Sequence, residues 1–375
     1  MRKQLYILAL FCFTLQANAQ TYSTNFNVNL ENAEVSKVNE IWKANLKTNS
    51  KEYWDSSEIK NLKNFNILDM SGIINPSLMN WNFDNRVLSI NPISENKYLI
   101  KSLFETENRE IFAITNVIAK KTNDGIKLSN FIFEYTKDWK ITETKNFKYI
   151  YPSTYNFSFE RATEAEDFYI NLCKTFEIKP EKLTYFIAEN CDNIYDMIGY
   201  DYIFSKGTSE ECGYFESKNN FIYATQKSGE NHYHEITHFI NEFYPNANEL
   251  LLTGISAYIS KDKAHFGKPL IYHTKRVNEY LKKNKEINLS KPFDFYSLDN
   301  ATNPQYVIGA ILCDLILEKG GKKLLINAFN NTKTDEDLIK FLDKNIITKN
   351  ENLNQKIRKT IDQISNKNNF PNFLE

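Results

Sequence analysis

Residues 234–238 read His-Glu-Ile-Thr-His, and this pentad is the main basis for predicting the fold and the function of the chain. The chain has five histidines, and three of them lie within residues 232–238. On a helix, His234 and His238 are one turn apart on the same face, so both imidazoles can reach one Zn²⁺ ion. Glu235 then lies beside the metal, where its carboxylate can take a proton from water and pass it to a leaving amine. The alternative interpretation is a surface helix that carries two histidines without binding metal.

The amino end has the pattern of a secretory signal peptide. Two basic residues precede an apolar run at 5–15, and Ala-Asn-Ala follows at 17–19 as a cleavage site. We expect cleavage before Gln20, so that residues 1–19 are removed and the mature protein is secreted or periplasmic. The apolar run is too short to span a bilayer, and no later stretch of the sequence is long enough.

The length and charge of the chain limit the number of domains and the kinds of partner that it can bind. The mature chain has about 356 residues, which is enough for two domains. Without Arg2 and Lys3, the 46 basic residues fall to 44 against 47 acidic residues, a net charge of −3. No basic stripe stands out, so the sequence supports neither a nucleic-acid partner nor an anionic-membrane partner. Only 11 glycines and 9 prolines are present, which argues against long linkers.

Four cysteines remain after signal removal, at positions 173, 191, 212 and 313. In an oxidising compartment, Cys191 and Cys212 could close a loop of about twenty residues, which stabilises a fold by roughly 3 kcal/mol. Cys173 and Cys313 lie in apolar helical patterns and are expected to be buried thiols. Four cysteines allow three pairings, so their spacing alone leaves the connectivity open.

Residues 20–147 are predicted to form an α+β module of a helix and a curved antiparallel sheet. The helix is expected at 34–48, where apolar residues recur at helical spacing. Asn-Asp-Gly at 123–125 is a strong turn signal, because these residues tolerate positive φ in a tight hairpin. A cone-shaped domain of the nuclear-transport-factor type is one interpretation of this module. Strand-like runs occur at 86–93, 96–106, 109–121, 126–136 and 139–151.

Residues 148–375 are predicted to form a mainly helical domain with a small sheet. A helix is expected at 163–176, and strands are expected at 182–188 and 221–225, the second ending just before the pentad. Capping residues mark the later helices. The first of these helices is expected to begin at Asn246, and the second to run from Asn303-Pro304 to Gly320-Gly321. The third is expected to begin at Thr334 with Asp337, and the last to extend from Leu353 to Ile364.

The order of motifs in this second half is distinctive. Phe-Ile-Tyr-Ala at 221–224 precedes the pentad, Leu-Leu-Thr-Gly-Ile-Ser-Ala-Tyr follows at 251–258, and Tyr-Val-Ile-Gly-Ala lies at 306–310. Over about residues 150–345, this order resembles the gluzincin-type, peptidase MA-like zinc metallopeptidases. The resemblance implies a metallopeptidase-like domain, a zinc cofactor, and a peptide or protein substrate.

The sequence departs from the resemblance at the third zinc ligand. In such families the residue before the Gly of the second helix is normally Glu, whereas here it is Thr253. A catalytic zinc ion usually has three protein ligands and a water, and a neutral hydroxyl replaces a carboxylate poorly. Glu249 lies one turn earlier on the same helical face and is the candidate replacement, although with Asn246 it also forms a capping pattern. His265 and His273 are further candidates, with ordinary surface histidines as the alternative.

Three functions stay open. The first is an exported zinc peptidase with Glu235 as general base, in which Tyr306 could stabilise an oxyanion or could simply pack. The second is an inactive metallopeptidase-like protein that binds its partner outside the cytoplasm without cutting it. The third has a structural metal or none, with the N-terminal module as the binding part. The intact pentad favours the first function, and Thr253 favours the second.

Overall fold

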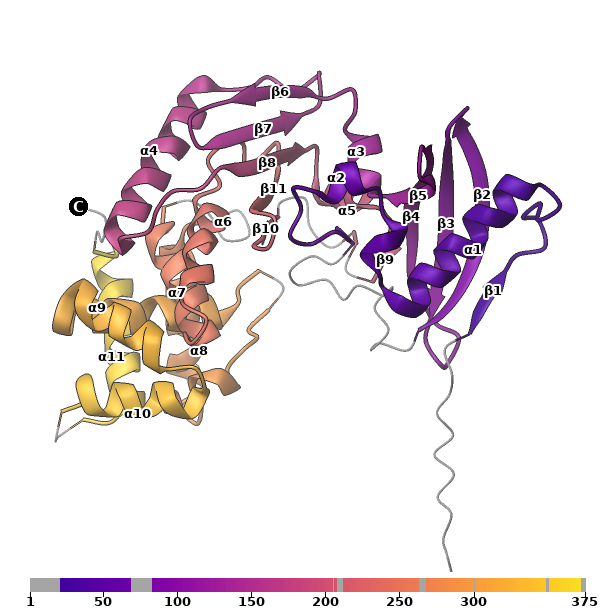
Figure 1. Ribbon diagram of the computed structural model, residues 1–375. Helices are drawn as coiled ribbons and strands as arrows, with labels where there is room; N and C mark the ends of the chain where they lie inside the picture. Colours follow the sequence, from indigo (N-terminus) through magenta and orange to yellow (C-terminus); the bar gives the residue numbers. More distant parts are fainter. Residues whose placement is uncertain are drawn as a thin grey trace, which may run out of the picture.

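The computed structural model describes residues 21–68, 83–204, 206–207, 212–262, 268–299, 301–348 and 351–371. Within these ranges the protein is α+β, as expected, with a six-stranded sheet, a five-stranded sheet and a group of helices toward the carboxyl end (Figure 1). The predicted signal peptide at 1–19 lies outside the described residues. Of the helices in the described ranges, none combines the length and the apolar character needed to cross a bilayer.

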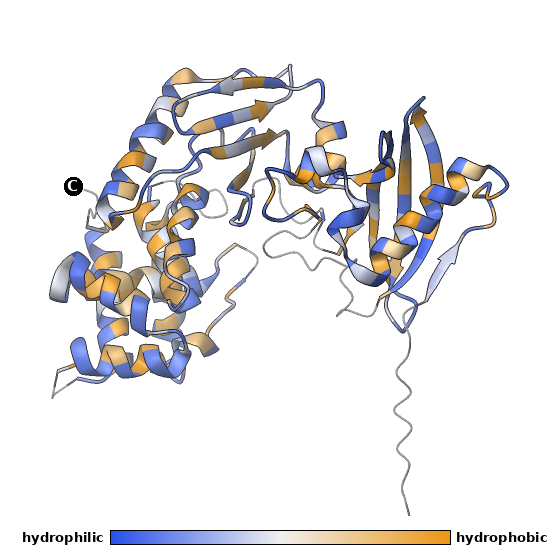
Figure 2. Cartoon of the chain, in the orientation of Figure 1, coloured by the Kyte–Doolittle hydropathy of each residue, from blue (hydrophilic) through white to orange (hydrophobic). Residues whose placement is uncertain are grey.

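The first sheet is mainly an antiparallel meander. The predicted turn at 123–125 is confirmed, and Gly125 has φ +93°, a backbone conformation that favours glycine. Hydrophobic and hydrophilic segments alternate along its strands, so that one face is buried (Figure 2). In spatial order the strands are β1 (Tyr22–Thr24), β2 (Asp84–Ser94), β3 (Lys97–Glu105), β4 (Ile111–Thr122) and β5 (Gly125–Ser129), and β9 (Tyr200–Ile203) also pairs with β4.

Helix α1 (Ala33–Thr48) lies across this sheet, which confirms the predicted first helix (Figure 1). The Asn32 side chain caps it by accepting hydrogen bonds from two backbone N–H groups of the first turn. Trp42 is fully buried, and its indole N–H donates to the Ser102 hydroxyl of β3 at 2.7 Å. The apolar stripe of α1 therefore sets its position on the sheet.

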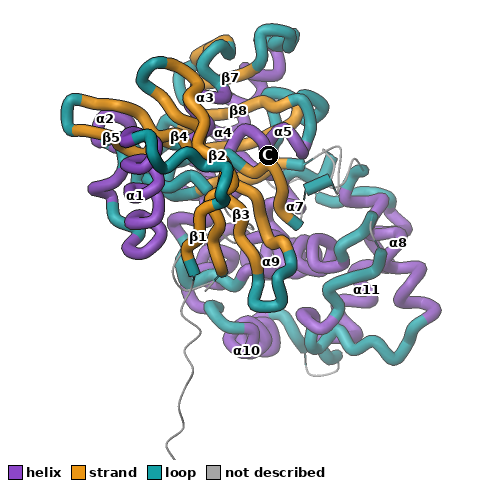
Figure 3. Tube along the Cα trace, turned by 90° about the vertical axis from the view of Figure 1, so that its right-hand side faces the viewer, coloured by secondary structure: helices purple, strands orange, loops and turns teal. Residues whose placement is uncertain are grey.

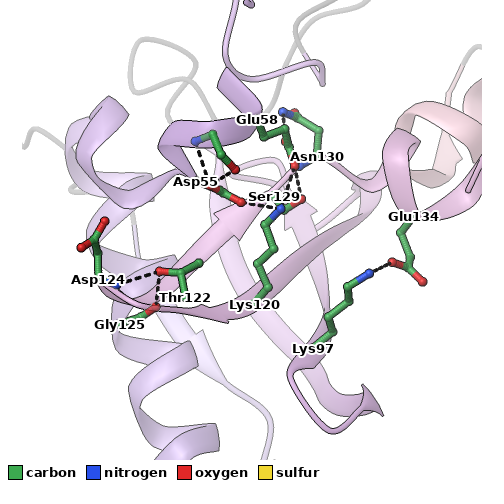
Figure 4. Close-up of polar contacts among 11 residues, drawn as sticks. Asp55, Glu58, Lys97, Lys120, Thr122, Asp124, Gly125, Ser129, Asn130 and Glu134 are labelled. Carbon is green, nitrogen blue, oxygen red and sulfur yellow. Dashed lines mark hydrogen bonds and ion pairs between the residues drawn. The ribbon is translucent and has the colours of Figure 1, made fainter. Parts of the chain in front are cut away.

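Polar contacts attach the short helix α2 (Ser56–Ile59) to the same sheet (Figure 4). Lys120 of β4 pairs with Asp55 at 2.5 Å and with Glu58 at 3.4 Å. Glu58 also accepts hydrogen bonds from the backbone N–H and the side-chain amide of Asn130, at 2.8 and 2.9 Å. These carboxylates join α2 to the end of β5 and to the helix that follows.

The predicted strands at 126–136 and 139–151 are corrected by the structure. The run at 126–136 ends as a strand at Ser129, and α3 (Phe131–Tyr135) follows, because Asn130 turns the chain by bonding to Glu58 and to the Phe65 carbonyl. The run at 139–151 is a hairpin of two strands, and it belongs to the second sheet. Aromatic and branched residues suit strands, but their tertiary contacts decide the outcome.

The second sheet is mixed, with parallel pairs in its centre and an antiparallel pair at each edge. Helix α4 (Phe159–Phe176) covers one face, and α5 (Cys191–Ile198) packs on the other, where one hydrophobic cluster extends into the first sheet. Division of the chain into domains at residue 147 stays a prediction. In spatial order the strands are β10 (Gly213–Glu216), β11 (Phe221–Thr225), β8 (Leu183–Ala188), β7 (Phe147–Tyr151) and β6 (Lys140–Glu143).

The carboxyl half is mainly helical, and most of its helices lie in the lower half of Figure 3. The predicted caps at Asn303 and Thr334 are confirmed, but Asn248 and not Asn246 caps α7. The predicted helix end at Gly320-Gly321 is confirmed, because Gly321 has a non-helical backbone with φ +61°, and a second helical segment follows this break and packs into the same core. The helices are α7 (Glu249–Ile259), α8 (Leu270–Lys283), α9 (Pro304–Asn331), α10 (Asp335–Asn345) and α11 (Leu353–Lys367).

Candidate metal site

The pentad lies on a short helix that depends on its neighbours. Helix α6 (Tyr233–Thr237) has five residues, and the 3-10 helix η3 (His238–Phe243) continues it. His232 occupies the N-cap position of α6, and its side chain makes no capping hydrogen bond. A helix of this length has little stability of its own. Ile236 and Phe239 are buried against the second sheet, so packing determines where α6 lies.

The two predicted ligands face one another, as their spacing requires. The Nε2 atoms of His234 and His238 are 3.1 Å apart, and the two rings are nearly perpendicular. Two nitrogens on a tetrahedral zinc ion at about 2.0–2.1 Å lie roughly 3.3 Å from each other. Possible ligand atoms of His234, Glu235 and His238 all lie within 4.8 Å of one another, the one such group among the described residues. The donor set therefore fits a divalent cation through its two imidazoles.

Glu235 is enclosed by β10. Its side chain is only 6% exposed, and burial raises its pKa to about 8 although the backbone N–H of Phe215 donates to it. A Cβ added to Gly213 would lie 2.7 Å from Cγ of Glu235 and 2.8 Å from Nε2 of His232. Glycine at 213 thus lets the strand backbone approach the carboxylate, a contact that no local pattern in the sequence predicted.

The second nitrogen of His238 contacts polar groups that orient the ring. Nδ1 lies 2.8 Å from the side-chain amide of Asn241 and 3.3 Å from the hydroxyl of Ser256 on α7. Such partners hold a metal-binding imidazole in one orientation. Burial lowers the pKa of His238 to about 4, which favours the neutral ring that binds metals. Ser256 was not among the site residues predicted from the sequence, although it lies one turn after Thr253.

Helices α7 and α9 cross closely, which explains why the motifs at 251–258 and 306–310 each contain a glycine. A Cβ on Gly254 would clash with the backbone of Gly309, and a Cβ on Gly309 would clash with the Leu250 carbonyl. The crossing places Tyr306 of α9 beside His234, with ring centroids 5.9 Å apart. Burial raises the pKa of Tyr306, and the nearby Glu235 adds to this rise. Tyr306 therefore faces the site as a protonated phenol.

The structure brings no further acidic or histidine side chain into the group within its described residues. Glu249 is exposed at the first position of α7, and Thr253 is half-buried one turn later. His273 is buried in α8, where its Nδ1 lies 3.0 Å from the Thr302 hydroxyl. His265 lies outside the described residues. The role of Glu249 or Thr253 as third ligand stays a prediction.

A disulfide joins Cys191 and Cys212, with their Cα atoms 5.8 Å apart, and this confirms the predicted pair. Cys173 and Cys313 are buried free thiols, also as predicted, and burial raises the pKa of Cys173 to about 11. Cys212 immediately precedes β10. The bond therefore attaches the start of the strand that encloses Glu235 to the first turn of α5.

Two solved structures are distantly similar to the chain. An M1 zinc metallopeptidase mutant from Deinococcus radiodurans is 9% identical with a TM-score of 0.32, over 79% of this chain and 67% of that one. An aminopeptidase N family protein from Idiomarina loihiensis is 12% identical with a TM-score of 0.34, over 71% of this chain and 54% of that one. The sequence matches no protein-family model and no curated protein. TM-scores of this size do not establish a shared fold, so the function rests on the residues of the site.

Proposed function

We propose that the protein is an exported zinc-dependent peptidase with His234 and His238 as metal ligands and Glu235 as general base. One observation carries the proposal, the 3.1 Å separation of the two Nε2 atoms with the Glu235 carboxylate beside them. Zinc is the metal of choice because a pair of imidazoles at helical spacing suits it and because the neutral ring is favoured at His238.

The surrounding residues suit hydrolysis of an amide. A zinc ion, when bound, polarises the scissile carbonyl as a Lewis acid. Glu235 takes the proton of the attacking water and delivers it to the leaving nitrogen, while the Phe215 N–H orients its carboxylate. The Tyr306 hydroxyl donates a hydrogen bond to the carbonyl oxygen as negative charge develops there.

A peptide or protein substrate fits the position of β10. This strand pairs with β11 along one edge, and its Gly213 backbone lies against Glu235. An extended peptide can add to the edge of a sheet through main-chain hydrogen bonds. Such pairing would carry a peptide bond past the carboxylate.

Export is part of the proposal, to the periplasm or out of the cell. Its support is the signal-peptide pattern at 1–19 together with the Cys191–Cys212 bond, because disulfides persist mainly in oxidising compartments.

An inactive metallopeptidase-like protein that binds a peptide without cutting it is the second candidate. It is favoured by Thr253 at the place of a carboxylate and by the exposure of Glu249. With two protein ligands, zinc would be held more weakly than in a three-ligand catalytic site.

Zinc titration calorimetry and peptide hydrolysis test both candidates. We expect the purified protein to bind stoichiometric zinc and to cleave members of a mixed peptide library, read by mass spectrometry. The double variant His234→Ala/His238→Ala should lose both properties, and unchanged zinc affinity in it would rule out this site. Tight zinc binding without any cleavage would favour the inactive alternative.

A third ligand can be supplied to sharpen this test. Thr253→Glu should tighten zinc binding by at least tenfold, which is about 1.4 kcal/mol. Glu249→Gln is the matched control, and it should leave zinc affinity unchanged because Glu249 is exposed. Release of zinc by Glu249→Gln would instead identify Glu249 as the native third ligand.

A further inference from the structure

The segment before α6 receives long-range polar contacts that the mechanism above does not use. The Tyr185 hydroxyl of β8 donates to the Gly229 carbonyl at 2.7 Å and accepts the His232 N–H at 3.2 Å. The Tyr149 hydroxyl of β7 donates to the Glu230 carbonyl at 3.3 Å. Two strands of the second sheet thus hold both ends of residues 229–232, where α6 lacks a side-chain cap.

Glu230 is the centre of this network. Its side chain is fully buried, and its carboxylate pairs with Nε of Arg161 at 2.9 Å. The same carboxylate accepts the backbone N–H of Ser158, the cap of α4, at 2.6 Å. A buried carboxylate is tolerated only when paired in this way, and an apolar pair of the same size would often be as stable. The ion pair therefore has its main effect on where the segment lies.

Arg161 also fits tightly against the backbone beside Glu230. Gly229 has φ +69°, and a Cβ added there would clash with the Arg161 guanidinium. Arg161 in turn donates to the Tyr155 hydroxyl at 3.1 Å. One turn later on α4, Glu164 accepts a hydrogen bond from the Asn231 side chain at 2.6 Å. The amino end of α4 thus contacts three consecutive residues, 229–231.

We infer that Glu230, through its pair with Arg161, is a positioning residue that holds the amino end of α6, the helix that carries His234. His234 is four positions after Glu230, so a shift of this segment moves α6 against β10, α7 and α9. Those elements supply Phe215, Ser256 and Tyr306 to the site. The inference rests on the proposed function for its metal, zinc, but it needs only metal binding and not peptide cleavage.

Metal binding by the full-length chain tests the inference. In Glu230→Gln, which keeps the shape and removes the charge, we expect zinc affinity to fall at least tenfold. The visible absorption spectrum of the Co²⁺-substituted protein should change as well, because it reports ligand geometry. Arg161→Met should have a similar effect, and the double variant should be no worse than either single variant. Wild-type zinc affinity and Co²⁺ spectrum in a folded Glu230→Gln protein would overturn the inference.

Matched controls separate positioning from general stability. Tyr185→Phe and Tyr223→Phe each remove one hydroxyl from a fully buried tyrosine of adjacent strands, and the Tyr223 hydroxyl has no hydrogen-bond partner among the described residues. Only Tyr185→Phe should weaken zinc binding, and this pair replaces Glu230→Gln if that variant fails to fold. Equal zinc affinity in both Phe variants would count against the inference. If the zinc-loaded wild type cleaves no peptide, the proposed peptidase function is contradicted, but the inference about Glu230 is not.

Discussion

Helices α2 and α6 are both too short to be stable alone, and carboxylates hold the surroundings of each. The contacts of α2 come from Asp55 and Glu58, which pair with Lys120 of β4 in the first sheet (Figure 4). The contacts of α6 come from deeper in the protein, where Glu230 is fully buried and Glu235 nearly so. Carboxylate pairs therefore attach a helix to the first sheet, and we infer that they position α6 beside the second sheet.

The largest expected difference between the two regions is in turnover. Glu235→Gln should lower peptide turnover by about 10²–10⁴-fold, because it removes the general base while both imidazoles remain. Zinc content should stay unchanged. Asp55→Asn is the matched amide substitution near α2, and it should leave turnover as in the wild type. A fall in turnover with Asp55→Asn as large as with Glu235→Gln would erase the distinction between the regions.

Removal of the disulfide should affect stability next most strongly. Cys191→Ala with Cys212→Ala is expected to lower the free energy of unfolding by about 3 kcal/mol, since a loop of this size is no longer closed. Urea denaturation measures this change. Because Cys212 precedes β10, zinc affinity should fall too, whereas the first sheet should keep its cooperative unfolding. Unchanged stability would show that the bond does not constrain the unfolded chain.

Replacement of Gly213 or Gly125 by alanine compares a glycine beside Glu235 with one in a hairpin turn of the first sheet. Gly213→Ala places a Cβ 2.7 Å from Cγ of Glu235, and we expect turnover to fall by about tenfold, or 1.4 kcal/mol. Gly125→Ala meets no atom within 4 Å, but its φ of +93° is strained, so it should lower stability by about 1 kcal/mol. Steady-state kinetics and thermal unfolding of both variants test this. Wild-type kinetics for Gly213→Ala would mean that β10 moves freely.

The smallest effect concerns pH and the α2 region. Burial tends to raise the pKa of Asp55, but hydrogen bonds from Lys120 and Ser57 more than offset it, so the pKa lies below 3.8 in the folded protein. Asp55 therefore stabilises the fold above its unfolded pKa, and this contribution is lost as pH falls through the lowered value. Asp55→Asn should lower stability by about 1 kcal/mol at pH 7, with the difference shrinking below pH 3.8. A constant difference from pH 7 to pH 2 would contradict it.

Local patterns in the sequence predicted the local parts of the fold correctly. The pentad spacing predicted facing imidazoles, and the capping residues Asn303 and Thr334 mark the helix starts found in the structure. The Cys191–Cys212 pair was also predicted from spacing and the expected compartment. The prediction of a strand through residues 131–135 failed, because Asn130 turns the chain through contacts with residues distant in sequence.

By itself the sequence determined which residues could bind metal, because helical periodicity places His234 and His238 on one face whatever surrounds them. Only the tertiary structure decided what encloses them. Arg161 and Glu230 are 69 positions apart in the sequence. Gly213 of β10 lies against Glu235 of α6, and no periodic pattern in the sequence predicts this contact. Periodicity reports which face of an element is buried, but the identity of its partner depends on packing between segments far apart in the chain.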